Sequence, residues 1–269
     1  MKVKLIGIFG LFLVGIFIYN YIQISKFFIN KLSFQTNKLS KSLRITQISD
    51  YHSNNLINKK RLLDEISQFN PHIIALTGDI IDSRAEEIYP TLDLIKELTK
   101  INSNIYFVIG NHELRNINGN TFIENLKEVG VTVLDNENTI IQIEDEKVNI
   151  CGLSFFATKE DYENILAKIN KDYFTLLLSH SPNRIIRYTK GIEDLILTGH
   201  THGGQVRLPI IGAIVSSGQG LFPKYDKGVF NIKNTILYID SGLGNSLFPI
   251  RFFNRVQICN ITIESTKNS

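Results

Sequence analysis

The sequence predicts an α/β fold in which helices pack around two sheets, preceded by a separate apolar helix at the N-terminus. Short β-branched runs alternate with amphipathic stretches over most of the chain, and the last quarter is rich in strand-forming residues. Of the 269 residues, 43% are hydrophobic and 20% are charged. This balance provides enough apolar side chains for a core and excludes disordered, collagen-like and coiled-coil chains.

The regular alternation begins near residue 43, and residues 43–269 have a length that one α/β domain can fill. Apolar residues at helical spacing predict helices over residues 59–69, 88–98 and 122–129. Strands are expected at residues 44–49, 73–77, 105–109, 131–134, 148–153, 174–178, 195–198, 235–239 and 256–263.

Residues 1–25 are expected to form a single-pass transmembrane anchor. Residues 5–25 contain no charged side chain, and a helix needs about 20 apolar residues to span a bilayer. A cleaved signal peptide is the alternative, but it requires small residues after a shorter apolar run. Here Tyr19, Asn20 and Tyr21 follow instead. The pattern therefore favours localisation in the cell membrane, with the membrane contacted through residues 5–25.

Residues 26–42 mix lysines with single apolar residues and are expected to form a juxtamembrane stalk or an interfacial helix. More lysines follow the apolar run than precede it, so a positive-inside count would hold the domain in the cytoplasm. A large folded domain can override this bias, and the side of the membrane stays open on these grounds.

Charge and cysteine content exclude several kinds of protein. The chain has 29 Lys and Arg against 26 Asp and Glu, a net charge of +3, which is too small to indicate a nucleic-acid partner. Two cysteines exclude a disulfide scaffold and a zinc site of four thiolates. Cys151 and Cys259 lie in apolar runs and are expected to be buried. Whether they pair is not determined by the sequence.

Five clusters of metal-ligand side chains each follow a predicted strand. They comprise residues 50–52 (DYH), 78–82 (GDIID), 110–113 (GNHE), 179–180 (SH) and 199–204 (GHTHGG). Of the six histidines, only His72 lies outside them. Sites in α/β sheets form at the carboxyl ends of strands, so these clusters are expected to converge. Carboxylates, an amide and imidazoles without thiolate suit Mn, Fe, Zn, Co or Ni, and the number of ligands favours two ions.

The order of these clusters resembles that found in the calcineurin-like metallophosphoesterases. Over residues 50–202 it reads D-x-H, GD-x-x-D, GNH-E, a lone His and GH-x-H. The strings LTGDIID, GNHELR and LTGHTHGGQVRLP, and SGLGNSLFPIRFFNR at residues 241–255, are similar to the membrane-associated YkuE/YaeI-like branch of that family. The resemblance implies a calcineurin-like αββα sandwich of two mixed sheets flanked by helices.

The resemblance also implies seven ligands for two divalent metal ions. One ion would be held by Asp50, His52 and His202, the other by Asn111, His180 and His200, and Asp79 would bridge them. His112 would face the substrate and protonate the leaving oxygen. Asp82 would hydrogen-bond to His112 and orient it, with a helix N-cap as the alternative role. Glu113 would support the site without binding metal.

The implied activity is hydrolysis of a phosphodiester or pyrophosphate bond by a hydroxide that bridges the two metals. The clusters offer no obvious Ser or Cys nucleophile, so no phospho-enzyme is expected. The resemblance favours a lipid-linked or cell-envelope substrate and the extracytoplasmic side. A metal-dependent DNA nuclease is one alternative, although no nucleic-acid partner is expected from the charge. A non-catalytic, membrane-tethered metal-binding scaffold is the other, and it leaves His112 without a role.

Aromatic and basic residues recur together near the C-terminus. Phe222 lies close to Lys224, and residues 248–255 contain three more phenylalanines and two arginines. Such a segment would either contact anionic lipid near the anchor or consist of core strand residues with solvated charges between them.

Overall fold

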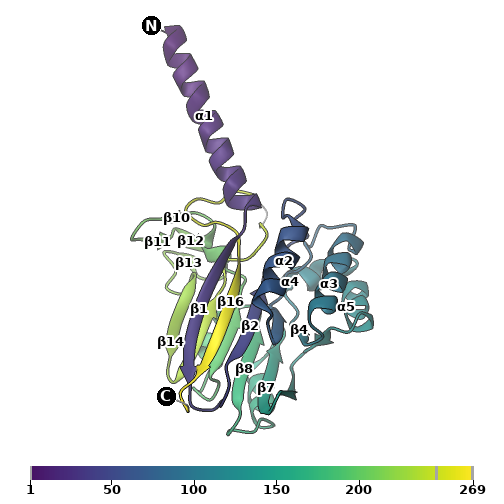
Figure 1. Ribbon diagram of the computed structural model, residues 1–269. Coiled ribbons are helices and arrows are strands. Elements are labelled where there is room, and N and C mark those ends of the chain that lie inside the picture. Colours follow the sequence, from purple (N-terminus) through teal and green to yellow (C-terminus); the bar gives the residue numbers. More distant parts are fainter. Residues whose placement is uncertain (1, 246–247, 268–269) are drawn as a thin grey trace.

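The computed structural model describes residues 2–245 and 248–267. Three of the regions expected from the sequence extend outside the described part: the anchor at residue 1, the string 241–255 at residues 246–247, and the domain at residues 268–269. A long N-terminal helix stands on a layered domain (Figure 1). The helices are α1 (Lys2–Ser25), α2 (Lys59–Phe69), α3 (Tyr89–Ile101), α4 (Asn111–Arg115), α5 (Gly119–Glu128), α6 (Lys159–Leu166), α7 (Pro182–Tyr188) and the short 3₁₀ helix η1 (His202–Gly204).

The first sheet has the strand order β1-β16-β2-β3-β4-β5. Strand β16 runs antiparallel to β2, and the other neighbours in this sheet are parallel. Its strands are β1 (Phe28–Thr36), β2 (Leu43–Ile48), β3 (Ile73–Leu76), β4 (Ile105–Phe107), β5 (Thr132–Val133) and β16 (Gln257–Ser265).

The second sheet has the order β14-β15-β9-β8-β7-β6, with a parallel centre and an antiparallel pair at each edge. Its strands are β6 (Glu137–Ile143), β7 (Glu146–Leu153), β8 (Phe174–Ser179), β9 (Leu195–Thr198), β14 (Gly228–Ile232) and β15 (Thr235–Ile239). Two small hairpins, β10 (Arg207–Leu208) with β11 (Gly212–Ala213) and β12 (Val215–Ser216) with β13 (Gly220–Leu221), follow η1.

Three hydrophobic clusters hold the layers together. The central cluster joins the inner faces of the two sheets and includes Ile45, Leu176 and Tyr238. A second cluster packs α2, α3 and α5 on the first sheet, and a third packs α6 and α7 on the second. Strands β3, β8 and β9 are buried on both faces, which explains their continuous apolar runs. The predicted αββα sandwich is therefore confirmed.

The segment after the anchor differs from the expectation. Residues 26–42 were expected to form a stalk or an interfacial helix, but Phe28–Thr36 form β1, which pairs in parallel with β16 along its whole length. Ile29, Leu32 and Phe34 pack against the hydrophobic clusters, while alternate residues face solvent. An edge strand with one exposed face carries lysines between apolar residues, which is also the pattern expected for an interfacial segment.

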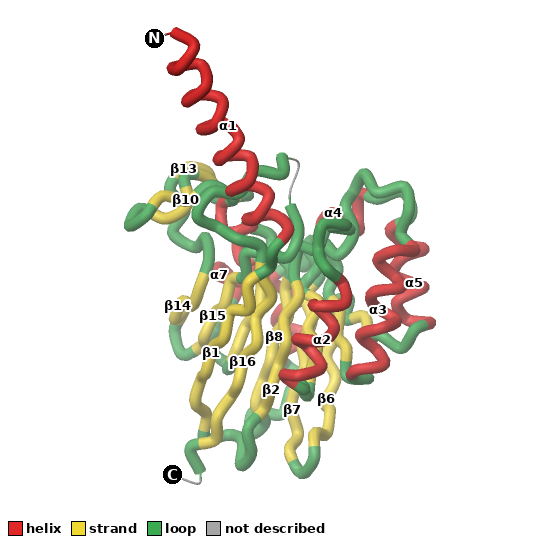
Figure 2. The backbone as a smooth tube through the Cα atoms, turned by 45° about the horizontal axis from the view of Figure 1, so that its top comes forward, coloured by secondary structure: helices red, strands yellow, loops and turns green. Residues whose placement is uncertain are grey.

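Helix α1 is long and apolar enough to cross a membrane, over Ile6–Ser25, and that stretch is exposed except at its end, where Ile24 and Ser25 are buried. Its last turns are hydrogen-bonded to the C-terminal part of the chain. The side chain of Asn20 donates to the carbonyl of Pro249 and accepts from the backbone N–H of Arg251, both at 2.9 Å. The backbone N–H of Phe253 donates to the Tyr19 hydroxyl at 3.0 Å. Figure 2 shows the β10–β13 hairpins beside this end of α1.

Candidate metal centre

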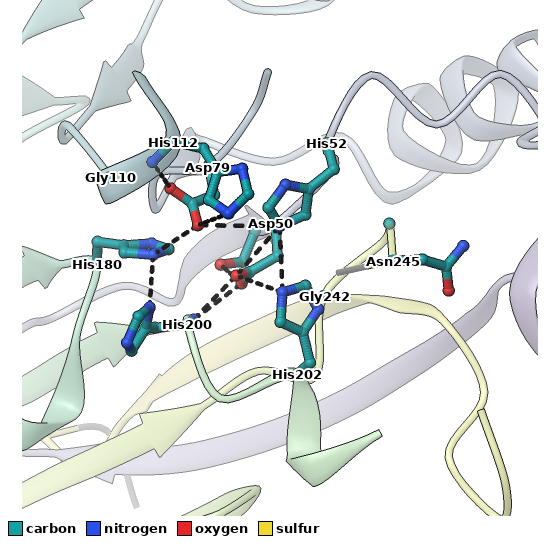
Figure 3. A network of polar contacts seen from close by, with 12 residues as sticks. Asp50, His52, Asp79, Gly110, His112, His180, His200, His202, Gly242 and Asn245 are labelled. Carbon is teal, nitrogen blue, oxygen red and sulfur yellow. Dashed lines mark hydrogen bonds and ion pairs between the residues drawn. The ribbon is translucent and has the colours of Figure 1, made fainter. Parts of the chain in front are cut away.

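The five clusters predicted to converge lie together at one edge of the sandwich. Strands β2, β3 and β4 are parallel neighbours in the first sheet, and β8 and β9 are parallel neighbours in the second, so their carboxyl ends face the same side. The hydrogen bond from Gln47 Nε2 to the carbonyl of Thr198 joins the two sheets just below this edge, at 2.9 Å. Figure 3 shows the side chains of the site pointing toward one another: Asp50, His52, Asp79, His112, His180, His200 and His202.

The loops that carry these side chains have an unusual backbone. Asp50, His52, Asp79, His200 and His202 all have positive φ, between 49° and 70°. Non-glycine residues adopt this region rarely, and such strain concentrates at functional sites. The loops hold one another in place, since the backbone N–H groups of Asp50 and His52 donate to the carbonyls of Gly78 and Asp79.

Asp50, His52 and His202 form the first group of potential ligands, in which one donor atom from each lies within 4.8 Å of the others. The Nε2 atoms of His52 and His202 are 3.1 Å apart, and Nε2 of His202 is 3.5 Å from Asp50 Oδ1. The Asp50 carboxylate is fixed by the Ser49 hydroxyl and the His200 backbone N–H, which both donate to it. Two ring nitrogens directed at one carboxylate are suited to a shared cation.

Asp79, His180 and His200 form a second group with the same spacing. Nε2 of His180 lies 3.1 Å from Asp79 Oδ2 and 3.2 Å from Nδ1 of His200. Nδ1 of His180 lies 2.8 Å from the carbonyl of Thr77, which can only accept a hydrogen bond, so the Nδ1–H donates to it. This contact leaves Nε2 free to bind a metal, the arrangement typical of metal-ligating histidines.

Asp79 connects the two groups, and Asn111 offers a further candidate ligand atom. Asp79 Oδ2 also lies 3.8 Å from Nε2 of His52, which places the carboxylate between the groups. Asn111 begins α4 and is buried, and among the described residues its Oδ1 atom has no hydrogen-bond partner. A buried amide oxygen without a partner is costly. A cation at this position would satisfy it, so the donor set fits metal binding.

The protonation states of three of the histidines agree with this fit, whereas a neighbouring carboxylate raises the pKa of His180 to about 10, against the effect of burial. Burial lowers the pKa of His52 to about 4 and of His200 to about 3, and it lowers the pKa of His202 as well, so these imidazoles are neutral at neutral pH. Neutral imidazole is the form that binds metals. Burial also raises the pKa of Asp50 to about 7 when no cation compensates its charge. Divalent cations would reverse that penalty by stabilising the carboxylate.

His112 lies beside the ligands, with Nε2 3.9 Å from Asp79 Oδ2. We expected Asp82 to hydrogen-bond to His112, but its nearest oxygen is 3.8 Å from Nδ1, beyond hydrogen-bond distance. The backbone N–H of Ser83 donates to Nδ1 instead, at 2.9 Å. Asp82 does not cap a helix either; its carboxylate accepts from the backbone and side chain of Arg84. Neutral His112 therefore carries its proton on Nε2, on the side of the metal ligands.

Glu113 supports the loop after β3 and the residue that precedes α4. Its carboxylate is buried and accepts four backbone hydrogen bonds, from the N–H groups of Asp79, Ile80, Ile81 and Gly110, at 2.6–3.1 Å. These bonds tie the loop after β3 to the start of α4. Glu113 thus positions Asp79 and Asn111 through the backbone around them, and it is not among the groups of potential ligands found in the described residues.

Replacing Glu113 with Gln should lower the melting temperature by about 5–10 °C, because the amide NH₂ would face backbone donors and about 2–3 kcal/mol of charge-assisted hydrogen bonding would be lost. Thermal unfolding of the full chain in detergent measures the change. Glu124→Gln, on the exposed face of α5, is the matched control and should unfold like the wild type. Equal melting temperatures for Glu113→Gln and the wild type would contradict the supporting role.

Arg251 is a member of the site that the sequence did not identify. Its side chain is fully buried and donates to the carbonyls of Ser241 and Gly244, both at 2.7 Å. Its Nη2 atom lies 3.3 Å from Nδ1 of His202. In the sequence, Arg251 lies in a basic and aromatic segment, where arginine is usually on the surface. The only signal was its place in the string 241–255 that resembles the family.

The sandwich and its cluster of buried carboxylates and imidazoles define an α/β protein with a candidate metal centre at the strand ends. A family model described as calcineurin-like phosphoesterase matches residues 43–204, which is more than half of the chain. The chain belongs to the calcineurin-like phosphoesterase family. It is a metal-dependent phosphohydrolase, and the resemblance seen in the sequence is confirmed.

Similar proteins agree with the family assignment, and a solved structure agrees with the fold. The metallophosphoesterases YkuE and YkoQ of Bacillus subtilis are each 30% identical to this chain, over 83% and 81% of it and 79% and 82% of their own lengths. A transmembrane protein with metallophosphoesterase domain from Bos taurus is 25% identical over 83% of this chain and 53% of its own. A 5'-nucleotidase precursor from Thermus thermophilus shares the fold, with a TM-score of 0.51 at 12% identity over 83% of this chain and 54% of its own.

Proposed function

We propose that the protein is a membrane-anchored phosphoesterase that hydrolyses phosphodiester or pyrophosphate bonds with two divalent metal ions. The observation that carries this proposal is the position of Asp79, whose carboxylate is grouped with His180 and His200 on one side and with His52 and His112 on the other. A structural metal site would need neither a shared carboxylate nor a histidine held next to it.

The two ions would occupy the two groups of side chains described above. Asp50, His52 and His202 would hold one, and Asn111, His180 and His200 the other, with Asp79 shared between them. When bound, Mn, Fe, Zn, Co or Ni ions would lower the pKa of water to give a nucleophile at neutral pH and would stabilise the charge of the phosphoryl group. The chain itself supplies their placement through the strained loops and the supporting contacts of Glu113 and Arg251.

His112 would act on the leaving group. Because Ser83 donates to its Nδ1, the Nε2–H of His112 is directed to the side where the ligands lie and can donate to the leaving oxygen. Burial lowers the pKa of His112, and the nearby carboxylates of Asp79 and Asp82 oppose this by favouring the protonated ring. Asp82 would therefore act on His112 through its charge, at 3.8 Å, rather than through a hydrogen bond.

His112→Ala should lower kcat by about 10²–10⁴-fold for phosphodiesters with alkoxide leaving groups, the usual range for a general acid. The loss should be much smaller for bis-p-nitrophenyl phosphate, because p-nitrophenolate leaves without a proton. Steady-state kinetics with both kinds of diester measures the difference. His72→Ala, which removes the histidine outside the site, should behave like the wild type. An equal loss for good and poor leaving groups would contradict the assigned role.

The membrane attachment and the surroundings of the site support a lipid-linked or cell-envelope phosphoester as substrate. A cleft of about 440 Å³ extends from His202 to Phe248 and Ile250. Ile250 also lines an apolar groove against Phe12 and Ile16 of α1. An amphiphilic substrate would place its phosphate at the metal ligands and its apolar part toward α1. The same proposal places the domain on the extracytoplasmic side, as the family resemblance implies.

A further inference from the structure

We propose that the β10–β13 hairpins and the segment 248–253 form a second membrane contact, in which a set of apolar side chains inserts into the interface of a lipid bilayer. We call this set the apolar rim; its main members are Ile210, Ile211, Leu221, Phe222, Phe248 and Phe253. The proposal rests on α1 being the membrane anchor, as proposed above, and adds a bilayer surface to it.

The apolar rim is exposed to an extent that is unusual for large hydrophobic side chains. Ile210 is fully exposed, and Leu221, Phe222 and Phe248 are each about two-thirds exposed, at 72%, 64% and 66%. Soluble proteins rarely gather such side chains into one patch, and larger apolar patches mark interaction surfaces. The aromatic segment 248–255 was expected either to contact lipid or to consist of core strand residues. Its phenylalanines are exposed, which rules out the core interpretation.

The charges around the apolar rim favour anionic lipid. Residues 205–225 and 241–255 contain no Asp or Glu, although the chain has 26 acidic residues. Arg207 is paired with Asp226 at 2.8 Å, which leaves Lys224 and Arg255 as the basic residues that border the rim. Basic residues next to apolar side chains bind the headgroup region of membranes that contain anionic lipids.

The backbone holds these side chains outward. Ile210, Phe222 and Phe253 have positive φ of 71°, 48° and 49°. For a β-branched residue such as Ile210 this conformation is a true outlier, and turns facing water normally have glycine or asparagine there. The β10–β11 hairpin fixes the turn that carries Ile210, with Leu208 opposite Gly212. The backbone N–H of Phe222 donates to the carbonyl of Ile214 just after β13. The turns thus place large apolar groups where a simple surface loop would have small or polar ones.

The apolar rim is continuous with α1. The ring of Tyr19 contacts the rings of Phe252 and Phe253 edge-on, with centroids 5.5 and 6.3 Å apart. Its hydroxyl accepts from the Phe253 backbone, so the segment 248–253 is fastened where the apolar helix meets the domain. Figure 1 shows the hairpins at the same end of the domain as α1. A bilayer that surrounds α1 would meet the rim at its surface.

This arrangement has a consequence for substrate access. Phe248 belongs both to the apolar rim and to the cleft that reaches His202. A phosphoester embedded in the bilayer would then enter the cleft from the interface, without leaving the lipid completely.

The absence of tryptophan from the sequence provides the test. Single Ile210→Trp and Phe222→Trp variants of the full chain are reconstituted in vesicles of anionic and zwitterionic lipids. Their fluorescence should be quenched about twofold by lipids brominated near the headgroup, since interfacial segments lie about 5–10 Å into the boundary between headgroups and acyl chains. Lipids brominated deep in the chains should quench less.

Two further variants separate the possible outcomes. Ile140→Trp, midway along the edge strand β6 and partly exposed, is the negative control and should not be quenched. Phe17→Trp, on the exposed apolar surface of α1, reports the anchor itself. Quenching of Phe17→Trp without quenching of Ile210→Trp and Phe222→Trp would overturn the apolar rim and leave the anchor in place. Absence of quenching in all of them would overturn the anchor as well.

Discussion

Asp79→Asn is expected to reduce the turnover of bis-p-nitrophenyl phosphate by about 10³-fold, which corresponds to about 4 kcal/mol of lost transition-state stabilisation. Asp79 is the one residue common to the groups around His52 and around His180 and His200. In the wild type the backbone N–H of His112 donates to Asp79 Oδ1 at 2.7 Å. An asparagine side chain has the same size and keeps an oxygen that can accept this hydrogen bond, so the fold is preserved. The negative charge between the two groups is lost.

The measurement is the steady-state rate of the metal-supplemented full chain in detergent. Asp93→Asn, on the exposed face of α3, is the matched control and should keep full activity. Retention of more than a tenth of the wild-type rate by Asp79→Asn would show that the shared carboxylate is not central. A parallel assay with single-stranded DNA distinguishes the nuclease alternative: cleavage that depends on Asp79 would favour it over the lipid-linked phosphoester.

Removal of metal is expected to abolish turnover and to lower the melting temperature by about 5–10 °C, equivalent to about 2.7 kcal/mol at 100-fold excess of metal over its Kd. Without cations, burial holds the pKa of Asp50 at about 7, above its ordinary 3.8. Between pH 4 and pH 7 the unfolded chain binds fewer protons at Asp50 than the folded chain. This group therefore makes the metal-free protein less stable as the pH rises through that range. Bound cations favour the ionised form and remove that loss.

The difference in melting temperature between metal-loaded and chelated protein should therefore be largest near pH 7.5 and should shrink toward pH 5, where protons compete for the ligands. Differential scanning fluorimetry with and without EDTA measures it, and elemental analysis of the active protein identifies and counts the ions. Asp79→Asn should show a smaller difference than the wild type. Full activity in protein that contains no stoichiometric divalent ion would contradict the metal assignment.

The core strands and helices could be predicted because their residues carry a strong local pattern. Helix α2 has the bounds predicted from its apolar spacing, and the side chain of Asn58 caps its start while Asn70 ends it in the left-handed conformation. Strands β3, β8 and β9 are buried on both faces, and continuous apolar runs identify such strands. In each case the information is contained in neighbouring residues.

Strand β1 could not be predicted because its pairing is not local. It lies at the edge of the first sheet with one side exposed, and its partner β16 is at the opposite end of the chain. The alternation of lysines and apolar residues is compatible with an edge strand and with an interfacial segment alike. Only the contact with β16 decides between them.

The sequence by itself determined which clusters of side chains meet, because each cluster follows a strand and parallel strands bring their carboxyl ends to one edge. The tertiary structure decided what supports those ligands. The Ser83 N–H, rather than Asp82, holds His112, and Arg251 reaches His202 from a segment joined to α1 by Asn20. These contacts depend on side-chain directions and on backbone groups in strained loops, which residue spacing does not encode. The distances between the atoms of the site are fixed only when the two sheets pack together.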